Sequence, residues 1–126
     1  HDLMLNIAGD GCYSINGQPY FINQNDYPNY PILHISKPFE DWFENEILTI
    51  QKSNVFDFSI ATDGIESFVK NENFNTPFFE NPPYLFLTQA EFLNHSNPLL
   101  WQYRQLEKEN ILPFDDLSII RVINPK

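Results

Sequence analysis

Acidic residues adjoin apolar, strand-like runs at two places in this sequence. Asp63 follows the run Val55 to Thr62, and Asp115 and Asp116 stand directly before the run Leu117 to Ile123. Carboxylate oxygens are the ligands that hard cations such as Mg²⁺ and Mn²⁺ prefer, so acids at two strand ends can share one ion. The pattern therefore points to metal-assisted hydrolysis rather than to simple binding.

Local turn chemistry is the simpler interpretation for two of these acids. Asp10 lies between two glycines, and Asp63 precedes Gly64. Aspartate tolerates such bends and hydrogen-bonds its own backbone there. Asp63 nevertheless sits between a predicted strand and a helix predicted over Ile65 to Lys70, which would aim its carboxylate rigidly. Asp115 and Asp116 repel each other as neighbours, and a nearby cation would relieve that repulsion.

Other common site chemistries find no matching motif. His1, His34 and His95 are far apart and lack the spacing of zinc ligands. No GxSxG, Walker loop or GxGxxG occurs. Cys12 has no second cysteine with which to form a disulfide, so we expect a small packing residue in a reducing, cytoplasmic compartment.

Composition limits the classes of partner. The 126 residues suit one domain, and the 17 acidic and 7 basic side chains give a net charge of -10. Such a surface repels nucleic acid and anionic membranes, although general solubility is the simpler explanation of the charge. No apolar run approaches the roughly 18 residues that a membrane-spanning helix needs.

The elements expected to position these residues are mostly strands. Leu3 to Ala8, Cys12 to Ile15 and Gln18 to Ile22 predict a three-stranded meander, with a tight hairpin at Asn16-Gly17. Thr88 to Glu91 has the pattern of a capped helix start.

The remaining chain adds a helix and a closing strand. Pro98 to Asn110 predicts a helix capped by Asn97, and Ser118 to Ile123 predicts a final buried strand. Strands occur in runs rather than in strict alternation with helices. We therefore expect an α+β fold, mainly an antiparallel sheet with flanking helices.

Three segments, in chain order, resemble the PP2C-type metal-dependent protein phosphatases. Leu5 to Gly11, followed by the hairpin Tyr13 to Gly17, resembles the GD turn and I-N-G hairpin of bacterial members. Phe58 to Ile65 resembles the family's strand end with an Ala-Thr-Asp-Gly motif. Asp115 to Val122 resembles its closing motif, in which an Asp and then an Asn or Asp precede an apolar strand. The matches together span nearly the whole chain.

The resemblance implies a fold, a metal centre and a reaction. The fold would be half of the family's αββα sandwich. Asp63 and Asp115 match the carboxylates that bind one ion of a binuclear Mg²⁺ or Mn²⁺ centre, and Asp10 matches an aspartate that helps some members hold a weaker third ion. Asp116 matches the residue beside the last ligand and would support it. In the family, a metal-activated water attacks a phosphoserine or phosphothreonine ester of a phosphoprotein.

The sequence departs from the family at the bridging aspartate, because it contains no DGxG motif. We therefore expect residues 1–126 to form a single partial domain, the C-terminal portion of a phosphatase domain. It would be inactive alone and would pack against the N-terminal portion of that domain or a partner chain. Two alternatives stay open: a non-catalytic, pseudophosphatase-like interaction domain, and an unrelated acidic α+β binding module.

Overall fold

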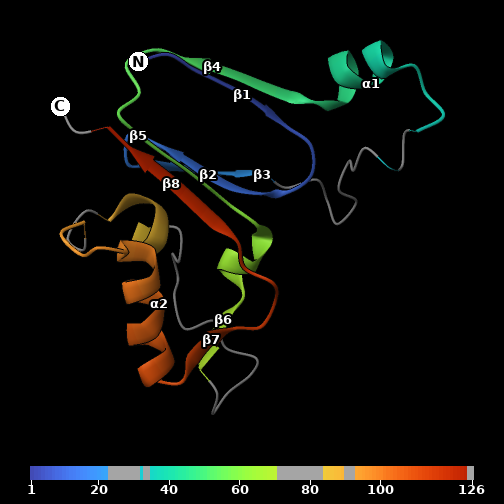
Figure 1. Ribbon diagram of the computed structural model, residues 1–126. Coiled ribbons are helices and arrows are strands. Elements are labelled where there is room, and N and C mark those ends of the chain that lie inside the picture. Colours follow the sequence, from blue (N-terminus) through green and yellow to red (C-terminus); the bar gives the residue numbers. More distant parts are fainter. Residues whose placement is uncertain (23–31, 33–34, 71–83, 90–92, 125–126) are drawn as a thin grey trace.

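The computed structural model describes residues 1–22, 32, 35–70, 84–89 and 93–124 (Figure 1). It combines antiparallel sheets with helices, which confirms the α+β class. The helices are α1 (Phe39–Glu46) and α2 (Pro98–Lys108). The strands are β1 (Leu3–Ile7), β2 (Gly11–Ile15), β3 (Gln18–Ile22), β4 (Leu48–Lys52), β5 (Asp57–Ala61), β6 (Phe68–Lys70), β7 (Ile111–Pro113) and β8 (Ile119–Ile123).

A four-stranded antiparallel sheet in the order β3-β2-β5-β8 forms the centre of the molecule. The hairpin between β2 and β3 turns at Asn16 and Gly17, whose φ angles are 52° and 83°. Positive φ at both positions is the geometry that Asn-Gly favours, so the predicted hairpin is confirmed. The predicted strands at Val55 to Thr62 and Ser118 to Ile123 are also present, as β5 and β8. The predicted burial of the final strand is wrong, because one side of β8 faces water.

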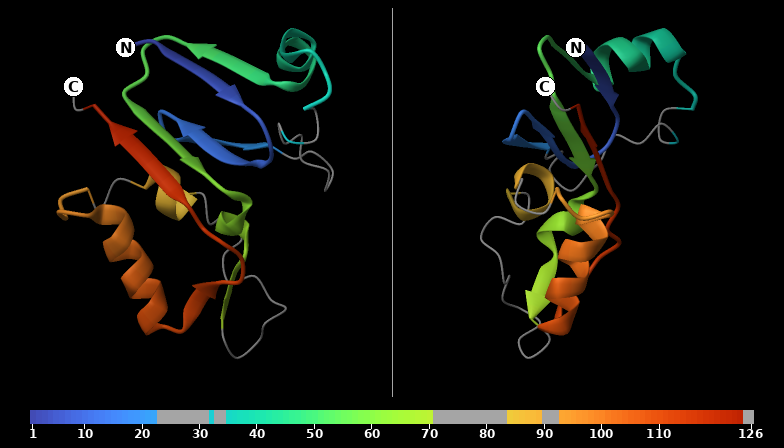
Figure 2. Two further views of the ribbon diagram at one scale, coloured as in Figure 1. Left: turned by 45° about the vertical axis from the view of Figure 1, so that its right-hand side comes forward. Right: turned by 60° about the vertical axis from the view of Figure 1, so that its left-hand side comes forward.

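The predicted three-stranded meander is wrong, because β1 does not pair with β2. β1 pairs instead with β4 in a separate two-stranded sheet, which lies at the opposite end of the molecule from α2 (Figures 1 and 2). Gly9 and Gly11, with φ of 100° and 142°, redirect the chain between β1 and β2. The free edge of β2 then pairs with β5.

The helix predicted over Ile65 to Lys70 is also wrong. A single 3₁₀ turn spans Asp63–Glu66, and the chain then extends as β6, which pairs with β7. The apolar spacing that suggested a helix has another cause, because Ile65 and Phe68 enter the core from the turn and from the strand. The helix start predicted at Thr88 to Glu91 falls largely outside the described residues. The described residues just before it, Tyr84–Thr88, form a π-helical turn.

The core lies on the side of the central sheet that carries α2 and the π-helical turn. The Asn97 side chain caps α2 by accepting a hydrogen bond from the Leu100 amide at 3.1 Å, as predicted. Apolar side chains from the sheet, both turns and α2 form one cluster: Cys12, Ala61, Ile65, Phe68, Phe86, Leu87, Leu106 and Ile111. In the part of the chain that the structure describes, no helix has the length and apolar character to cross a membrane.

Cys12 is a buried core residue, as expected, with 1% of its surface exposed. Burial, together with the negative charge of Glu66, raises the pKa of its thiol to about 11. The thiolate is the reactive form of cysteine, so this thiol stays protonated and inert at neutral pH.

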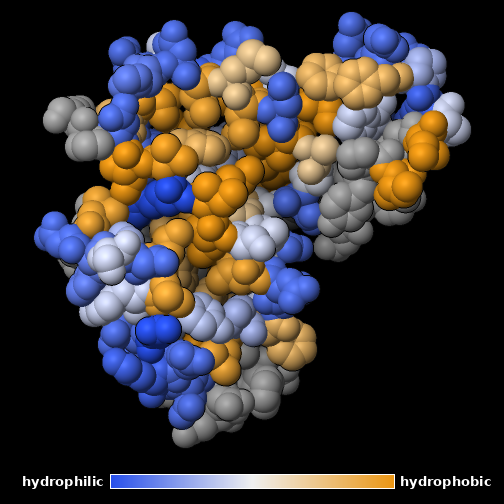
Figure 3. Space-filling view, viewed as in Figure 1, coloured by the Kyte–Doolittle hydropathy of each residue, from blue (hydrophilic) through white to orange (hydrophobic). Residues whose placement is uncertain are grey.

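Successive residues of β8 face opposite sides of the sheet. Arg121 points to the α2 side and forms an ion pair with Asp57 of β5. Ile120 and Val122 point to the other side and are 63% and 58% exposed. Figure 3 shows hydrophobic side chains gathered along this strand.

Candidate functional site

Three acidic segments lie at one end of three neighbouring strands. β5 ends at Ala61 opposite Ile119, where β8 begins, so Asp63 and the Asp115-Asp116 pair occupy the same end of adjacent strands. This is the placement that the sequence predicts for them. β2 begins beside the same end of β5, because Cys12 pairs with Ala61, and Asp10 therefore precedes it there.

Hydrogen bonds join the segment after β5 to the segment before β8. The Thr62 hydroxyl donates to the Asp116 carbonyl at 3.0 Å and accepts from the Ser118 amide at 3.0 Å. The Thr62 amide donates to the Ser118 carbonyl at 3.1 Å. At Gly64, a Cβ would overlap the carbonyl oxygen of Asp116 and lie 2.8 Å from its carbonyl carbon. Only glycine fits such a close approach of two backbones.

A single hydroxyl group, that of Ser67, fixes the backbone at the acidic pair. Its Oγ donates to the Gly64 carbonyl at 2.7 Å and accepts from the amides of Phe114 and Asp115, each at 3.1 Å. The Asp116 amide donates to Asp115 Oδ1 at 2.8 Å, which holds the Asp115 carboxylate in place. Sequence reasoning missed Thr62 and Ser67, although hydroxyl side chains beside an Asp-Gly turn are typical backbone-binding groups.

Asp10 and the acidic pair border different hollows. Asp10 borders a cavity of about 260 Å³ that is also lined by Ile60 and Ile120. Asp115 and Asp116 border a different hollow, lined by Ile119. Because Ile119 and Ile120 are successive strand residues, these two hollows lie on opposite faces of the sheet.

The described residues do not by themselves fit a metal ion. Aspartate oxygens have the right chemistry for Mg²⁺ or Mn²⁺. Among the residues that the structure describes, however, no group of three histidine, cysteine, aspartate or glutamate side chains could hold such an ion. The strand ends bring the backbones of Asp10, Asp63 and Asp115 to one edge without assembling three carboxylates around one point.

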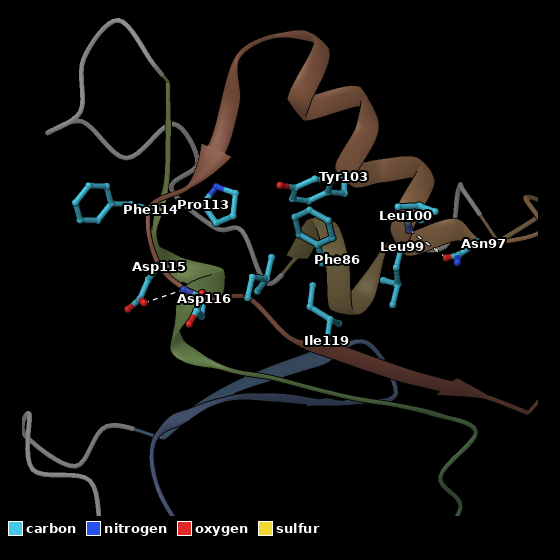
Figure 4. Close-up of a pocket in the computed structure, with 11 residues that line it drawn as sticks. Phe86, Asn97, Leu99, Leu100, Tyr103, Pro113, Phe114, Asp115, Asp116 and Ile119 are labelled. Atoms are coloured by element: carbon cyan, nitrogen blue, oxygen red, sulfur yellow. Dashed lines mark hydrogen bonds between the residues drawn. The ribbon is translucent and has the colours of Figure 1, made fainter.

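The hollow beside the acidic pair is a groove that sequence reasoning did not predict (Figure 4). It has a volume of about 780 Å³ and lies between α2 and the segment that leads from β7 into β8. Its lining residues are Phe86, Asn97, Leu99, Leu100, Tyr103, Pro113, Phe114, Asp115, Asp116, Leu117 and Ile119. The helical spacing of Leu99, Leu100 and Tyr103 was the available signal, but the same spacing is typical of a helix that faces a closed core.

Comparison of the chain with protein-family models, with curated proteins and with solved structures finds no match. The likeness to the phosphatase family therefore depends on the three sequence motifs alone.

Proposed function

We propose that the chain is part of a metal-dependent serine/threonine protein phosphatase. Asp63 and Asp115 would be ligands of a Mg²⁺ or Mn²⁺ ion, with Asp116 beside them and Asp10 nearer a weaker site. Because no three described side chains could hold an ion, the remaining ligands would come from outside the described residues. The substrate would be a phosphoprotein, and a reducing, cytoplasmic location agrees with the single buried cysteine.

The observation that carries this proposal is the alignment of the three acidic segments at one end of β2, β5 and β8. Two of those segments are held together by the Thr62 and Ser67 hydroxyl groups, which supports the assignment of Asp63 and Asp115 to one ion. A fixed backbone of this kind is what a carboxylate ligand set requires.

We expect the chain alone to bind Mn²⁺ weakly through Asp63 and Asp115 and to hydrolyse no phosphopeptide. Paramagnetic broadening of backbone amide signals in a Mn²⁺ titration would locate the ion at residues 62–64 and 115–117. Asp63→Asn and Asp115→Asn should each weaken Mn²⁺ binding by roughly tenfold or more, since each removes a charged ligand. Asp41→Asn, which removes an exposed acid from α1, is the matched control.

Activity should appear only when a DGxG-bearing N-terminal portion of a phosphatase domain is supplied in trans. In that mixture, Asp63→Asn should abolish the Mn²⁺-dependent hydrolysis of a phosphothreonine peptide. Equal Mn²⁺ affinities of Asp63→Asn and Asp41→Asn would reject the ligand assignment. Robust hydrolysis by the chain alone would show that no further ligand is needed.

A second candidate function, a non-catalytic interaction domain, is favoured by a different observation. The sheet face opposite α2 exposes Ile120 and Val122 of β8. Apolar side chains gathered on one face are typical of surfaces that contact another protein. A chain that binds no Mn²⁺ at Asp63 and Asp115 but associates with other chains through this face would have this second function.

A further inference from the structure

The groove beside α2 has the size and lining of a binding site. Its volume of about 780 Å³ falls within the range of about 300 to 1,000 Å³ that is usual for ligand pockets. Its middle is apolar and aromatic, with Phe86 and Tyr103 facing Ile119 (Figure 4). Asp115 and Asp116 lie together at one end.

Specific contacts hold the walls of this groove in place. Phe86 stacks on the buried Phe68 ring with 5.3 Å between the ring centroids. Asn97 caps α2 at one wall, and the Ser67 hydroxyl fixes the amides of Phe114 and Asp115 at the other. A site that already has its bound shape loses little conformational entropy when a ligand enters.

The rim of the groove exposes large apolar side chains. Phe114 is 74% exposed and Leu100 is 44% exposed, so the Phe114 ring and the Leu100 side chain both contact water at the edge of the groove. An exposed apolar patch with a polar border is typical of an interaction site. An occupant that covers Phe114 would remove this apolar surface from water.

The charge of the groove has one sign. Asp115 and Asp116 are its charged lining residues, and none of the described lining residues is basic. The whole chain carries a net charge of -10, which adds to the negative potential at the groove. A cationic ligand is therefore attracted to the acidic end, and an anionic one is repelled.

We propose that this groove binds a short basic peptide segment of a partner protein. An aromatic or aliphatic side chain of that segment occupies the apolar middle, beside Tyr103, and an arginine or lysine pairs with Asp115 and Asp116. Neighbouring residues of one peptide supply both groups, and arginine suits a carboxylate because its guanidinium donates two parallel hydrogen bonds. This binding goes beyond the proposed phosphatase function and requires no metal ion.

Fluorescence anisotropy with labelled, end-capped peptides tests the proposal in the presence of EDTA. The probe Lys-Arg-Phe-Leu-Lys should bind at least about tenfold more tightly than Glu-Glu-Phe-Leu-Glu, which reverses the charge. Its affinity should also be about tenfold higher than that of Lys-Arg-Gly-Ser-Lys, which lacks the apolar side chains. EDTA removes divalent ions, so this result is independent of whether Asp63 and Asp115 bind Mn²⁺.

Matched variants of the whole chain locate the binding. Phe114→Ala and Asp116→Asn should each weaken binding of Lys-Arg-Phe-Leu-Lys by about threefold to tenfold, because one removes apolar contact and the other removes charge. The controls are Phe39→Ala, which removes an exposed ring from α1, and Glu107→Gln, which removes an exposed acid of α2 outside the groove. Neither control should change the affinity by more than about twofold.

Several outcomes would overturn the proposal. Equal affinity for Lys-Arg-Phe-Leu-Lys and Lys-Arg-Gly-Ser-Lys would mean general attraction of positive charge to an acidic protein. If Phe114→Ala and Phe39→Ala changed the peptide affinity equally, the peptide would bind elsewhere. The same conclusion would follow if adding the peptide changed NMR amide chemical shifts only at residues outside the groove. Arginine amide binding as tightly as the peptide would indicate a small cation as the ligand.

Discussion

Arg121→Met should lower the free energy of unfolding by about 3–5 kcal/mol, because it leaves the Asp57 carboxylate buried without its partner. The pair is bidentate, with Nη2 2.7 Å from Oδ2 and Nε 3.1 Å from Oδ1. The two side chains are only 5% and 14% exposed. Arg121 Nη1 also donates to the Gln89 carbonyl at 2.8 Å, so the same side chain joins β5, β8 and the segment after the π-helical turn.

Urea unfolding, monitored by circular dichroism, measures this decrease in the free energy of unfolding. The double variant Asp57→Leu/Arg121→Met should recover part of the stability, since no buried charge then lacks a partner. Lys37→Met is the control, because the Lys37–Glu46 pair spans 3.5 Å and is 49% and 34% exposed. Exposed pairs of that kind contribute at most about 1 kcal/mol. A loss for Arg121→Met no larger than for Lys37→Met would refute the structural role of the buried pair.

Gly64→Ala should be the second most damaging of the proposed changes, with a loss of about 3 kcal/mol. The added methyl group would overlap the backbone carbonyl of Asp116, and a backbone cannot rotate away as a side chain can. The turn after β5 and the segment before β8 would have to separate. That movement would displace Asp63 from Asp115, so the variant should also weaken Mn²⁺ binding.

Gly17→Ala provides the comparison for this steric effect. Gly17 has no atom within 4 Å of an added Cβ, but its φ is 83°. A side chain there costs only the backbone strain, about 1 kcal/mol. Thermal unfolding of both variants distinguishes overlap from strain. If Gly64→Ala lost no more stability than Gly17→Ala, the close approach of the two backbones would not be a constraint.

Local signals were sufficient to predict several elements from the sequence. The hairpin at Asn16 and Gly17 depends on two adjacent residues that adopt positive φ, and α2 depends on a cap followed by helical spacing. The pairing of β1 with β4 could not be predicted in this way, because those strands are far apart in the chain. β6 was mistaken for helix because Ile65 and Phe68 are three residues apart, a spacing that would put both on one face of a helix. In the structure, a 3₁₀ turn followed by a strand buries the same two side chains.

The sequence predicted at which strand ends the candidate acids lie, but it did not predict on which face of the sheet they lie. Apolar runs beside Asp63 and Asp115 indicated which ends of β5 and β8 carry acids. The face on which an acid lies depends on strand register, and a shift of one residue exchanges the two faces. Sequence alone therefore did not separate Asp10 from the acidic pair. The groove was missed because its wall, α2, has the periodicity of an ordinary core helix.

The hydrogen bonds between Thr62 and Ser118 have a consequence for the order of folding. These residues are 56 positions apart, so bringing them together requires the closure of a long loop. Contacts between distant residues form late and slowly, whereas the β2–β3 hairpin needs only a two-residue turn. The hairpin can thus exist before the acidic strand ends meet. Until β8 docks on β5, neither the Asp63–Asp115 edge nor the groove beside α2 exists, and the chain in that state has no binding surface of either kind.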